Sequence, residues 1–176
     1  MDNFHVLVEN LRWHIIQIAL FLNEAKSKPL KDRSRYYKAS CLFSASNIEA
    51  LVYQLVLDKF NQGAIIEPSK EEKTTHSKVH FLPKEFHHTK DSTKKLVVCI
   101  ETENKFEWNS EISFNRLIGI GAKLGIFSKT LEKKLHRIRE KRNKIHIQGL
   151  THKDHRYSLR DVKSMNAIEL ALIRKI

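Results

Sequence analysis

Four side chains whose chemistry suits a phosphodiester lie within eight residues of one another: Arg139, Arg142, Asn143 and His146. Arginine presents a planar fork of donors to phosphate oxygens, and histidine can exchange a proton near neutral pH without a metal. Spacings of three and four residues bring such side chains together along one edge of a helix. We interpret the pattern as a phosphate-handling site, against the plainer alternative of a charged helix end that keeps its charges in solvent.

The helix that must position these residues is predicted to begin after Ser128 and to stop at Gly149. Arg142 lies inside its apolar stripe, which is roughly 80° wide. A guanidinium is costly to bury unless it is paired or stays hydrated, so Arg142 is expected to meet a carboxylate or a wet subunit interface. The apolar positions of the stripe are Leu131, Leu135, Ile138 and Ile145.

The segment 135–149, with its Arg-x-x-Arg-Asn-x-Ile-His-Ile core, resembles the signature helix of HEPN (higher eukaryotes and prokaryotes nucleotide-binding) domains. The family motif is an arginine, usually followed by a polar residue such as asparagine, and then a histidine after four to six intervening residues. Arg142 and Asn143 match the first two positions, but three residues separate Arg142 from His146. Six residues separate Arg139 from His146. Either arginine is thus a candidate for the family role. Segment 44–51 similarly resembles an inner helix of the family, and the closing helix resembles its last.

The resemblance implies a metal-independent endoribonuclease that uses no cofactor. The 2′-OH of RNA would attack its own phosphate, His146 would move a proton, Arg139 or Arg142 would stabilise the developing charge, and Asn143 would orient the histidine or the phosphate. Such proteins often act as toxins of toxin–antitoxin pairs or in phage defence, and often build the cleft from two subunits. The expected partners are therefore RNA, a second subunit docked through the signature helix, and a cognate antitoxin protein.

Two alternatives remain. The first is a non-catalytic helical dimer that binds RNA or nucleotide or docks a partner protein, which the short interval between Arg142 and His146 favours. The second is a charged scaffold without a nucleic-acid role, which the formal net charge of +12 and the pI near 9.7 disfavour.

Length and composition predict one globular domain over 1–176, since 176 residues with 41% hydrophobic content suffice for a single core. Cys41 and Cys99 lie far apart without a C-x-x-C pair, so we expect buried thiols and no metal site. The N-terminus lacks the basic region and cleavage site of a signal peptide, and no apolar run reaches the roughly 18 residues of a membrane span. The chain is therefore expected to be cytoplasmic and not bound to a membrane.

Hydrophobic periodicity predicts a mainly α, up-and-down bundle of about five helices. The first two are expected over 4–26 and from Arg33 or Ser34 to Asn61, the second central because its middle is rich in small residues. Glu49, among apolar neighbours of that second helix, is expected to face either solvent or an arginine of the signature helix. Ser110 is predicted to cap a third helix over 111–124, and a capping box of Ser158 and Asp161 to begin the last.

The segment 64–109 is predicted to be a polar insertion within this domain, irregular or containing a small β-hairpin. Pro68 and Pro83 interrupt it, and its helical rhythm fails. A β-branched run over 95–101 is expected to pair with 106–108. The insertion holds histidines without the regular spacing of zinc ligands, so no metal is expected there.

Overall fold

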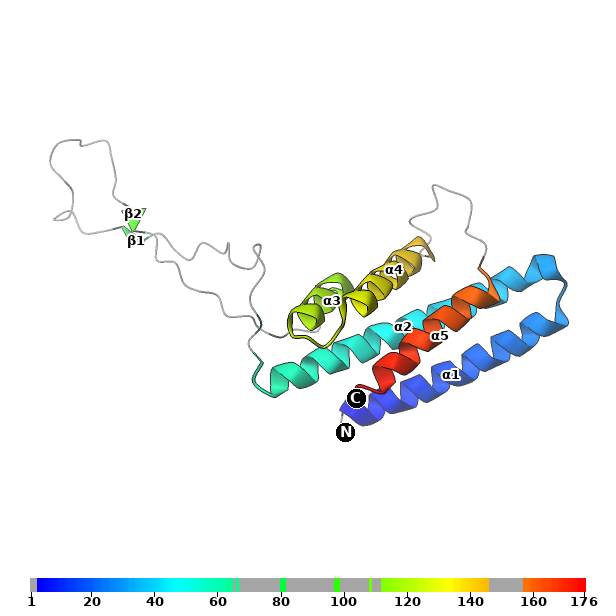
Figure 1. Cartoon of the computed structure of the whole chain (residues 1–176), viewed down its shortest axis with the longest axis horizontal. Helices are drawn as coiled ribbons and strands as arrows, with labels where there is room; N and C mark the ends of the chain where they lie inside the picture. Colours follow the sequence, from blue (N-terminus) through cyan, green and yellow to red (C-terminus); the bar gives the residue numbers. More distant parts are fainter. Residues whose placement is uncertain are drawn as a thin grey trace. The chain divides into compact units, whose positions relative to one another are not determined.

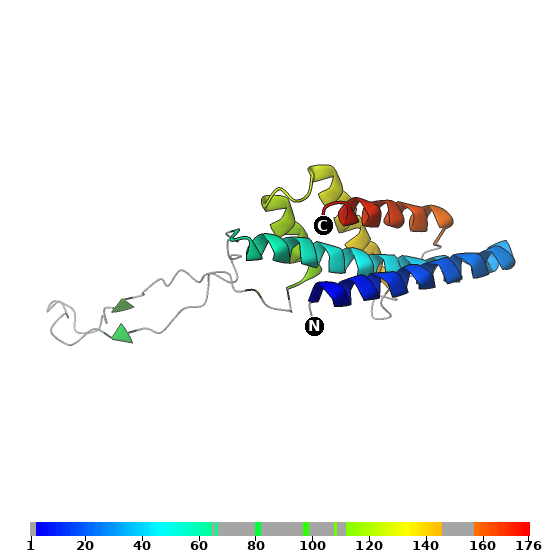
Figure 2. The same ribbon diagram turned by 90° about the horizontal axis from the view of Figure 1, so that it is seen from below.

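The computed structural model describes residues 3–64, 66, 80–81, 97–98, 108, 112–145 and 157–176 (Figures 1 and 2). The chain divides into two compact units. The first consists of Met1–Ala64 and Glu111–Ile176, and the second of Ile65–Ser110. Each unit is considered by itself.

The first unit is a helical bundle, so the prediction of a mainly α protein is confirmed. Its described residues form five α-helices and one short 3-10 helix, η1. They are α1 (Asn3–Ser27), η1 (Leu30–Asp32), α2 (Arg33–Asn61), α3 (Phe114–Lys123), α4 (Lys129–Ile145) and α5 (Leu159–Ile173). The longest helix, α2, contacts each of the other four α-helices and is the centre of the bundle (Figure 1).

Small side chains explain the central place of α2, as the sequence predicted. Ser40, Ser44 and Ala45 are buried, which lets neighbouring helices approach closely, while Ile48 and Leu51 fill the core. The Ser40 hydroxyl donates to the backbone oxygen of Tyr36, so its burial leaves no unpaired donor. Among the described residues, Leu30–Asn61 is long and apolar enough to cross a membrane by length and composition. The core helix of a bundle meets the same criteria.

Polar contacts fix the direction of α5. The Ser44 hydroxyl donates to Asn166 Oδ1 at 3.1 Å, and Asn47 Nδ2 donates to Glu169 Oε1 at 2.7 Å. Asn47 follows Ser44 by three residues and Glu169 follows Asn166 by three, so α2 and α5 run in the same direction. The predicted up-and-down order would make the second and fifth helices antiparallel, so it is wrong for this pair. This parallel pair places the start of α5 beside the start of α2, where the backbone N–H of Tyr157 donates to the Ser34 hydroxyl.

Helix caps agree with the sequence at two of three sites. The capping box of Ser158 and Asp161 is present at α5, and the Ser128 hydroxyl accepts from the backbone N–H of Leu131 in the first turn of α4. The third prediction was wrong, because Ser113 caps α3 in place of Ser110 and the helix begins at Phe114. Its hydroxyl accepts from the backbone N–H of Arg116, which closes the first turn.

The turn between α3 and α4 depends on two glycines. Gly125 adopts a φ of 71°, a conformation that side chains rarely permit, and so ends the α3 region. Gly121 packs against the ring of Phe127, since an added Cβ would lie 2.1 Å from its Cε2 atom. Close packing is therefore found at Gly121 and not at Gly119, where a Cβ would meet nothing within 4 Å.

Apolar patterns were less reliable in α1 and at the C-terminus. Ile18 and Ala25 are buried against the bundle, but Phe4 and Ile15, which keep the helical spacing of the same apolar side, are exposed. Ile176, which follows Ile168 and Leu172 at helical spacing, is exposed as well.

In the second unit, the described backbone contains one short antiparallel pairing. Residues His80–Phe81 (β1) pair with Val97–Val98 (β2), with His80 opposite Val98 and Phe81 opposite Val97. The predicted pairing of 95–101 with 106–108 lies largely outside the described residues and stays a prediction.

Candidate functional site

Three of the four predicted site residues lie in the last two turns of α4, which ends at Ile145. Arg139 and Arg142 are partly buried, and Asn143 is exposed. His146 follows directly after the helix and lies outside the described residues, as does Gly149. The structure therefore brings the two arginines and the asparagine together on one helix end, while the position of the histidine stays a prediction.

Arg142 occupies the apolar stripe of α4 because it is paired with a carboxylate. Leu135 and Ile138 of this stripe are buried, and one turn later Arg142 Nη2 lies 3.0 Å from Glu49 Oε2 of α2. The two side chains are 34% and 29% exposed, so the pair is partly hydrated. Of the two alternatives for Glu49, solvent or an arginine of the signature helix, the structure shows the arginine. The pair orients Arg142 more than it stabilises the fold.

Arg139 has a different environment, on the flank of α4 next to Arg142. Its Nε atom is buried without a hydrogen-bond partner in the described part of the chain. No carboxylate there forms an ion pair with Arg139. Of the two arginines, Arg139 is therefore the one whose charge is still open to an anion, whereas Arg142 already holds Glu49.

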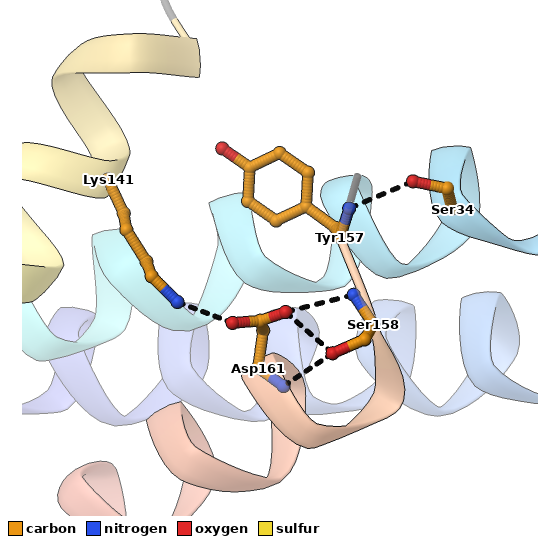
Figure 3. A network of polar contacts seen from close by, with 5 residues as sticks. All are labelled: Ser34, Lys141, Tyr157, Ser158 and Asp161. Atoms are coloured by element: carbon orange, nitrogen blue, oxygen red, sulfur yellow. Dashed lines mark hydrogen bonds and ion pairs between the residues drawn. The ribbon is translucent and has the colours of Figure 1, made fainter. Parts of the chain in front are cut away.

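A second ion pair joins the end of α4 to the start of α5, and sequence reasoning did not find it. Figure 3 shows Lys141 reaching from α4 to Asp161, whose carboxylate also receives two hydrogen bonds from Ser158. Partial burial of Asp161 would by itself raise its pKa, but the hydrogen bonds from Lys141 and Ser158 outweigh burial and hold the pKa at about 2. Asp161 thus stays ionised and ties the two helices together on either side of segment 146–156.

Inside the bundle, three helices share a polar cluster that the sequence also did not reveal. Asn47 is 1% exposed and Glu169 is 4% exposed, and Asn47 Nδ2 donates to Glu169 Oε1. His14 Nδ1 of α1 lies 2.5 Å from Asn47 Oδ1, so the imidazole nitrogen is the donor to this oxygen. Burial raises the pKa of Glu169, although the Asn47 hydrogen bond and the charge of His14 oppose that shift.

Metal-binding and thiol chemistry have little support in the described part of the chain. No group of three or more His, Cys, Asp or Glu side chains there could hold a metal ion. Cys41 is a free, buried thiol, as expected, and burial raises its pKa to about 12. It is therefore protonated and a poor nucleophile at neutral pH. Cys99 lies outside the described residues.

Comparison with known proteins finds no matching family model, no matching curated protein and no matching solved structure. Clues to function therefore come from the residues of the site and from the resemblance of segment 135–149 to the HEPN signature.

Proposed function

We propose that the protein is a metal-independent endoribonuclease of the HEPN type. In the cleavage step, a 2′-OH of the RNA attacks the adjacent phosphate of the same strand. The observation that carries the proposal is the clustering of Arg139, Arg142 and Asn143 at the end of α4, immediately before His146. This helix carries eight Lys and Arg residues against two Glu, a formal excess of six positive charges. Such an excess favours a polyanion by steering and by counterion release.

The residues take separate roles in this proposal. Arg139, which has no carboxylate partner among the described residues, binds the scissile phosphate and stabilises charge in the transition state. Arg142, oriented by Glu49, contacts a neighbouring phosphate or the same one from a second direction. His146 transfers the proton between the 2′-OH, the phosphate and the leaving 5′-oxygen, and Asn143 orients it. We further propose a cytoplasmic toxin or phage-defence role with an antitoxin protein as partner.

The test compares cleavage and binding by His146→Ala and the wild-type protein on the same RNA in excess chelator. We expect cleavage to persist in the wild type and to fall roughly 10²–10⁴-fold in the variant, the usual worth of a general acid or base, with little change in RNA affinity. His136→Ala, ten residues earlier on α4, is the matched control and should leave both unchanged. Unaltered cutting by His146→Ala, or cutting that requires a divalent ion, would contradict the proposal.

A second candidate function is RNA binding without cleavage, as a helical dimer or partner-docking module. The Arg142–Glu49 ion pair favours it, because a guanidinium held by a carboxylate is less available to a phosphate. The two functions differ in one measurement. A binding module would retain RNA with the same affinity in the His146→Ala variant and would show no cleavage in either protein at long incubation.

A further inference from the structure

We propose that the polar cluster of His14, Asn47 and Glu169 is a pH-sensitive contact that holds α1 on the bundle, and that α1 opens as the pH rises. The cluster joins three helices in one chain of hydrogen bonds. His14 Nδ1 of α1 lies 2.5 Å from Asn47 Oδ1 of α2, and Asn47 Nδ2 donates to Glu169 Oε1 of α5 at 2.7 Å. This contact is independent of the proposed ribonuclease activity, in which none of the three side chains takes part.

Helix α1 is the part of the bundle that can separate most easily. It lies along α2 at the edge of the bundle, and in the described part of the chain it has no extensive contact with α3, α4 or α5 (Figure 2). Of its described side chains Ile18 and Ala25 are buried, whereas α2 buries ten. A segment with few buried apolar contacts opens more often than the rest of a fold. Helix α1 can therefore separate while the other helices stay packed.

Asn47 makes the two ends of the cluster depend on each other. It is 1% exposed, so water cannot replace a partner that its amide loses while the helices stay packed. The amide oxygen accepts from His14 of α1, and the amide nitrogen donates to Glu169, which is 4% exposed. When α1 separates, the oxygen loses its donor, and water reaches Asn47 and the Glu169 carboxylate behind it. Opening of α1 therefore changes the environment of Glu169.

One charge from another helix acts on the Glu169 carboxylate. Burial raises the pKa of Glu169, and the Asn47 hydrogen bond and the charge of His14 oppose that shift. Among the charged groups of α1, α2 and α5, the imidazole of His14 is the one that acts on Glu169, since Asn47 of α2 does not titrate. His14 itself contacts Asn47 and the ring of Phe43, with 4.9 Å between the ring centroids. The protonation states of Glu169 and His14 are therefore coupled.

Both titrations weaken the cluster in the same direction. Once Glu169 ionises in its buried place, a protonated His14 balances its charge. Imidazoles as a class lose their proton between about pH 5 and 8, and a neutral His14 still donates to Asn47 but no longer balances the carboxylate. Opening of α1 hydrates the ionised Glu169. The closed state thus holds more protons than the open state, and it loses stability relative to the open state as the pH rises.

The test is hydrogen exchange of the backbone amides by mass spectrometry from about pH 5.5 to about pH 8, corrected for the intrinsic rate at each pH. We expect a larger opening constant for α1 than for α5, and an increase of roughly tenfold for α1 across this range. Glu169→Gln keeps the acceptor for Asn47 but cannot ionise, so its α1 should open no more at high pH than at low pH. Equal opening constants for α1 and α5, or a wild type whose α1 ignores pH, would overturn the proposal.

Two histidines of α1 provide a matched pair of variants. His14→Asn keeps a donor for Asn47 without a charge, so its α1 should open roughly fivefold more than that of the wild type at about pH 6 and equally at about pH 8. His5 is exposed and lies outside the cluster, so His5→Asn should follow the wild type at every pH. The proposal is wrong if both variants have the same effect, or if the pH dependence persists in Glu169→Gln.

Discussion

The ion pair between Arg142 and Glu49 explains how a charged residue can lie in the apolar stripe of α4. The stripe of α4 buries Leu135 and Ile138, and continuing it to Arg142 requires a counter-charge from α2. Glu49 supplies that charge at the edge of the core, where water still reaches both side chains. Among the described residues, no carboxylate pairs with Arg139, one turn earlier, so the charge of this second arginine is open to an anion.

Asp161 should make the free energy of unfolding depend on pH in the acidic range. Its pKa of about 2 lies below the ordinary value near 3.9, so its contribution is fully present above that value and is lost as pH falls toward 2. We expect Asp161→Asn to lower the free energy of unfolding by about 1–2 kcal/mol at pH 7, allowing for the partial exposure of Lys141. Urea denaturation from pH 7 to pH 2 measures this. A difference that does not shrink in acid would contradict the assigned role.

Glu169 should show the opposite dependence. Its pKa is raised above the unfolded value, so its stabilising contribution is present at low pH and is lost as pH rises through the folded-state pKa. Glu169→Gln keeps the shape and removes the titration. We expect the variant to match the wild type near pH 4 and to be the more stable protein at neutral pH. Denaturation midpoints measured from pH 4 to neutral pH test this prediction, with the exposed Glu140→Gln as the control. Midpoints that change with pH by the same amount in the wild type and in Glu169→Gln would refute it.

At the level of helices, the two glycines of α3 provide a matched pair. An alanine at position 121 would press its Cβ into the Phe127 ring, and overpacking of this kind costs typically about 1–3 kcal/mol. Gly119→Ala meets no atom within 4 Å, so it should be neutral or stabilise by up to about 1 kcal/mol through helix propensity. Thermal unfolding of the two variants checks the difference. Equal melting temperatures for Gly119→Ala and Gly121→Ala would show that the turn after α3 shifts to accommodate the added methyl group.

The sequence predicted those helices whose signals are local. Small residues in α2, Ser128 before α4 and the Ser158–Asp161 box each act within one or two turns, so they can be read without the fold. The start of α3 was misplaced because Ser110 and Ser113 are both good caps, and only packing decides between them. Burial along α1 could not be predicted in the same way, because its exposed apolar residues, such as Ile16 and Leu20, are indistinguishable from core residues in a linear pattern.

The candidate site was only partly predictable for a similar reason. The motif of Arg139, Arg142 and Asn143 is contiguous and could be found directly, and Glu49 was noticed as an acidic residue among apolar ones. The partnership of Lys141 with Asp161 spans twenty residues, and that of Asn47 with Glu169 spans 122. No local pattern encodes such contacts, because they arise only when whole helices pack.

On the scale of the whole molecule, charge is unevenly distributed. Helix α4 has an excess of six positive charges, while α5 has two basic and two acidic side chains. Under the proposed function, the affinity for RNA should therefore depend on salt through α4. Lys144→Ala should reduce the slope of log affinity against log salt by about 0.7, the value for one lost single-strand phosphate contact, and Lys163→Ala on α5 should not. Binding titrations over a salt series measure both slopes. Equal slopes for Lys144→Ala and the wild type would place the RNA elsewhere.

The division of the bundle into two sequence segments has a kinetic consequence. Helices α1 and α2 precede the unit Ile65–Ser110, whereas α3, α4 and α5 follow it, and α2 contacts the helices of both segments. An unfolded chain must therefore close a separation of at least 46 residues before α2 meets α3. Loop-closure entropy grows by about 0.6 kcal/mol for each doubling of length, so a linker of about six residues would lower this cost by roughly 2 kcal/mol. The encounter of α2 with the helices that follow this unit, rather than the formation of the helices themselves, should therefore determine the folding rate of the bundle.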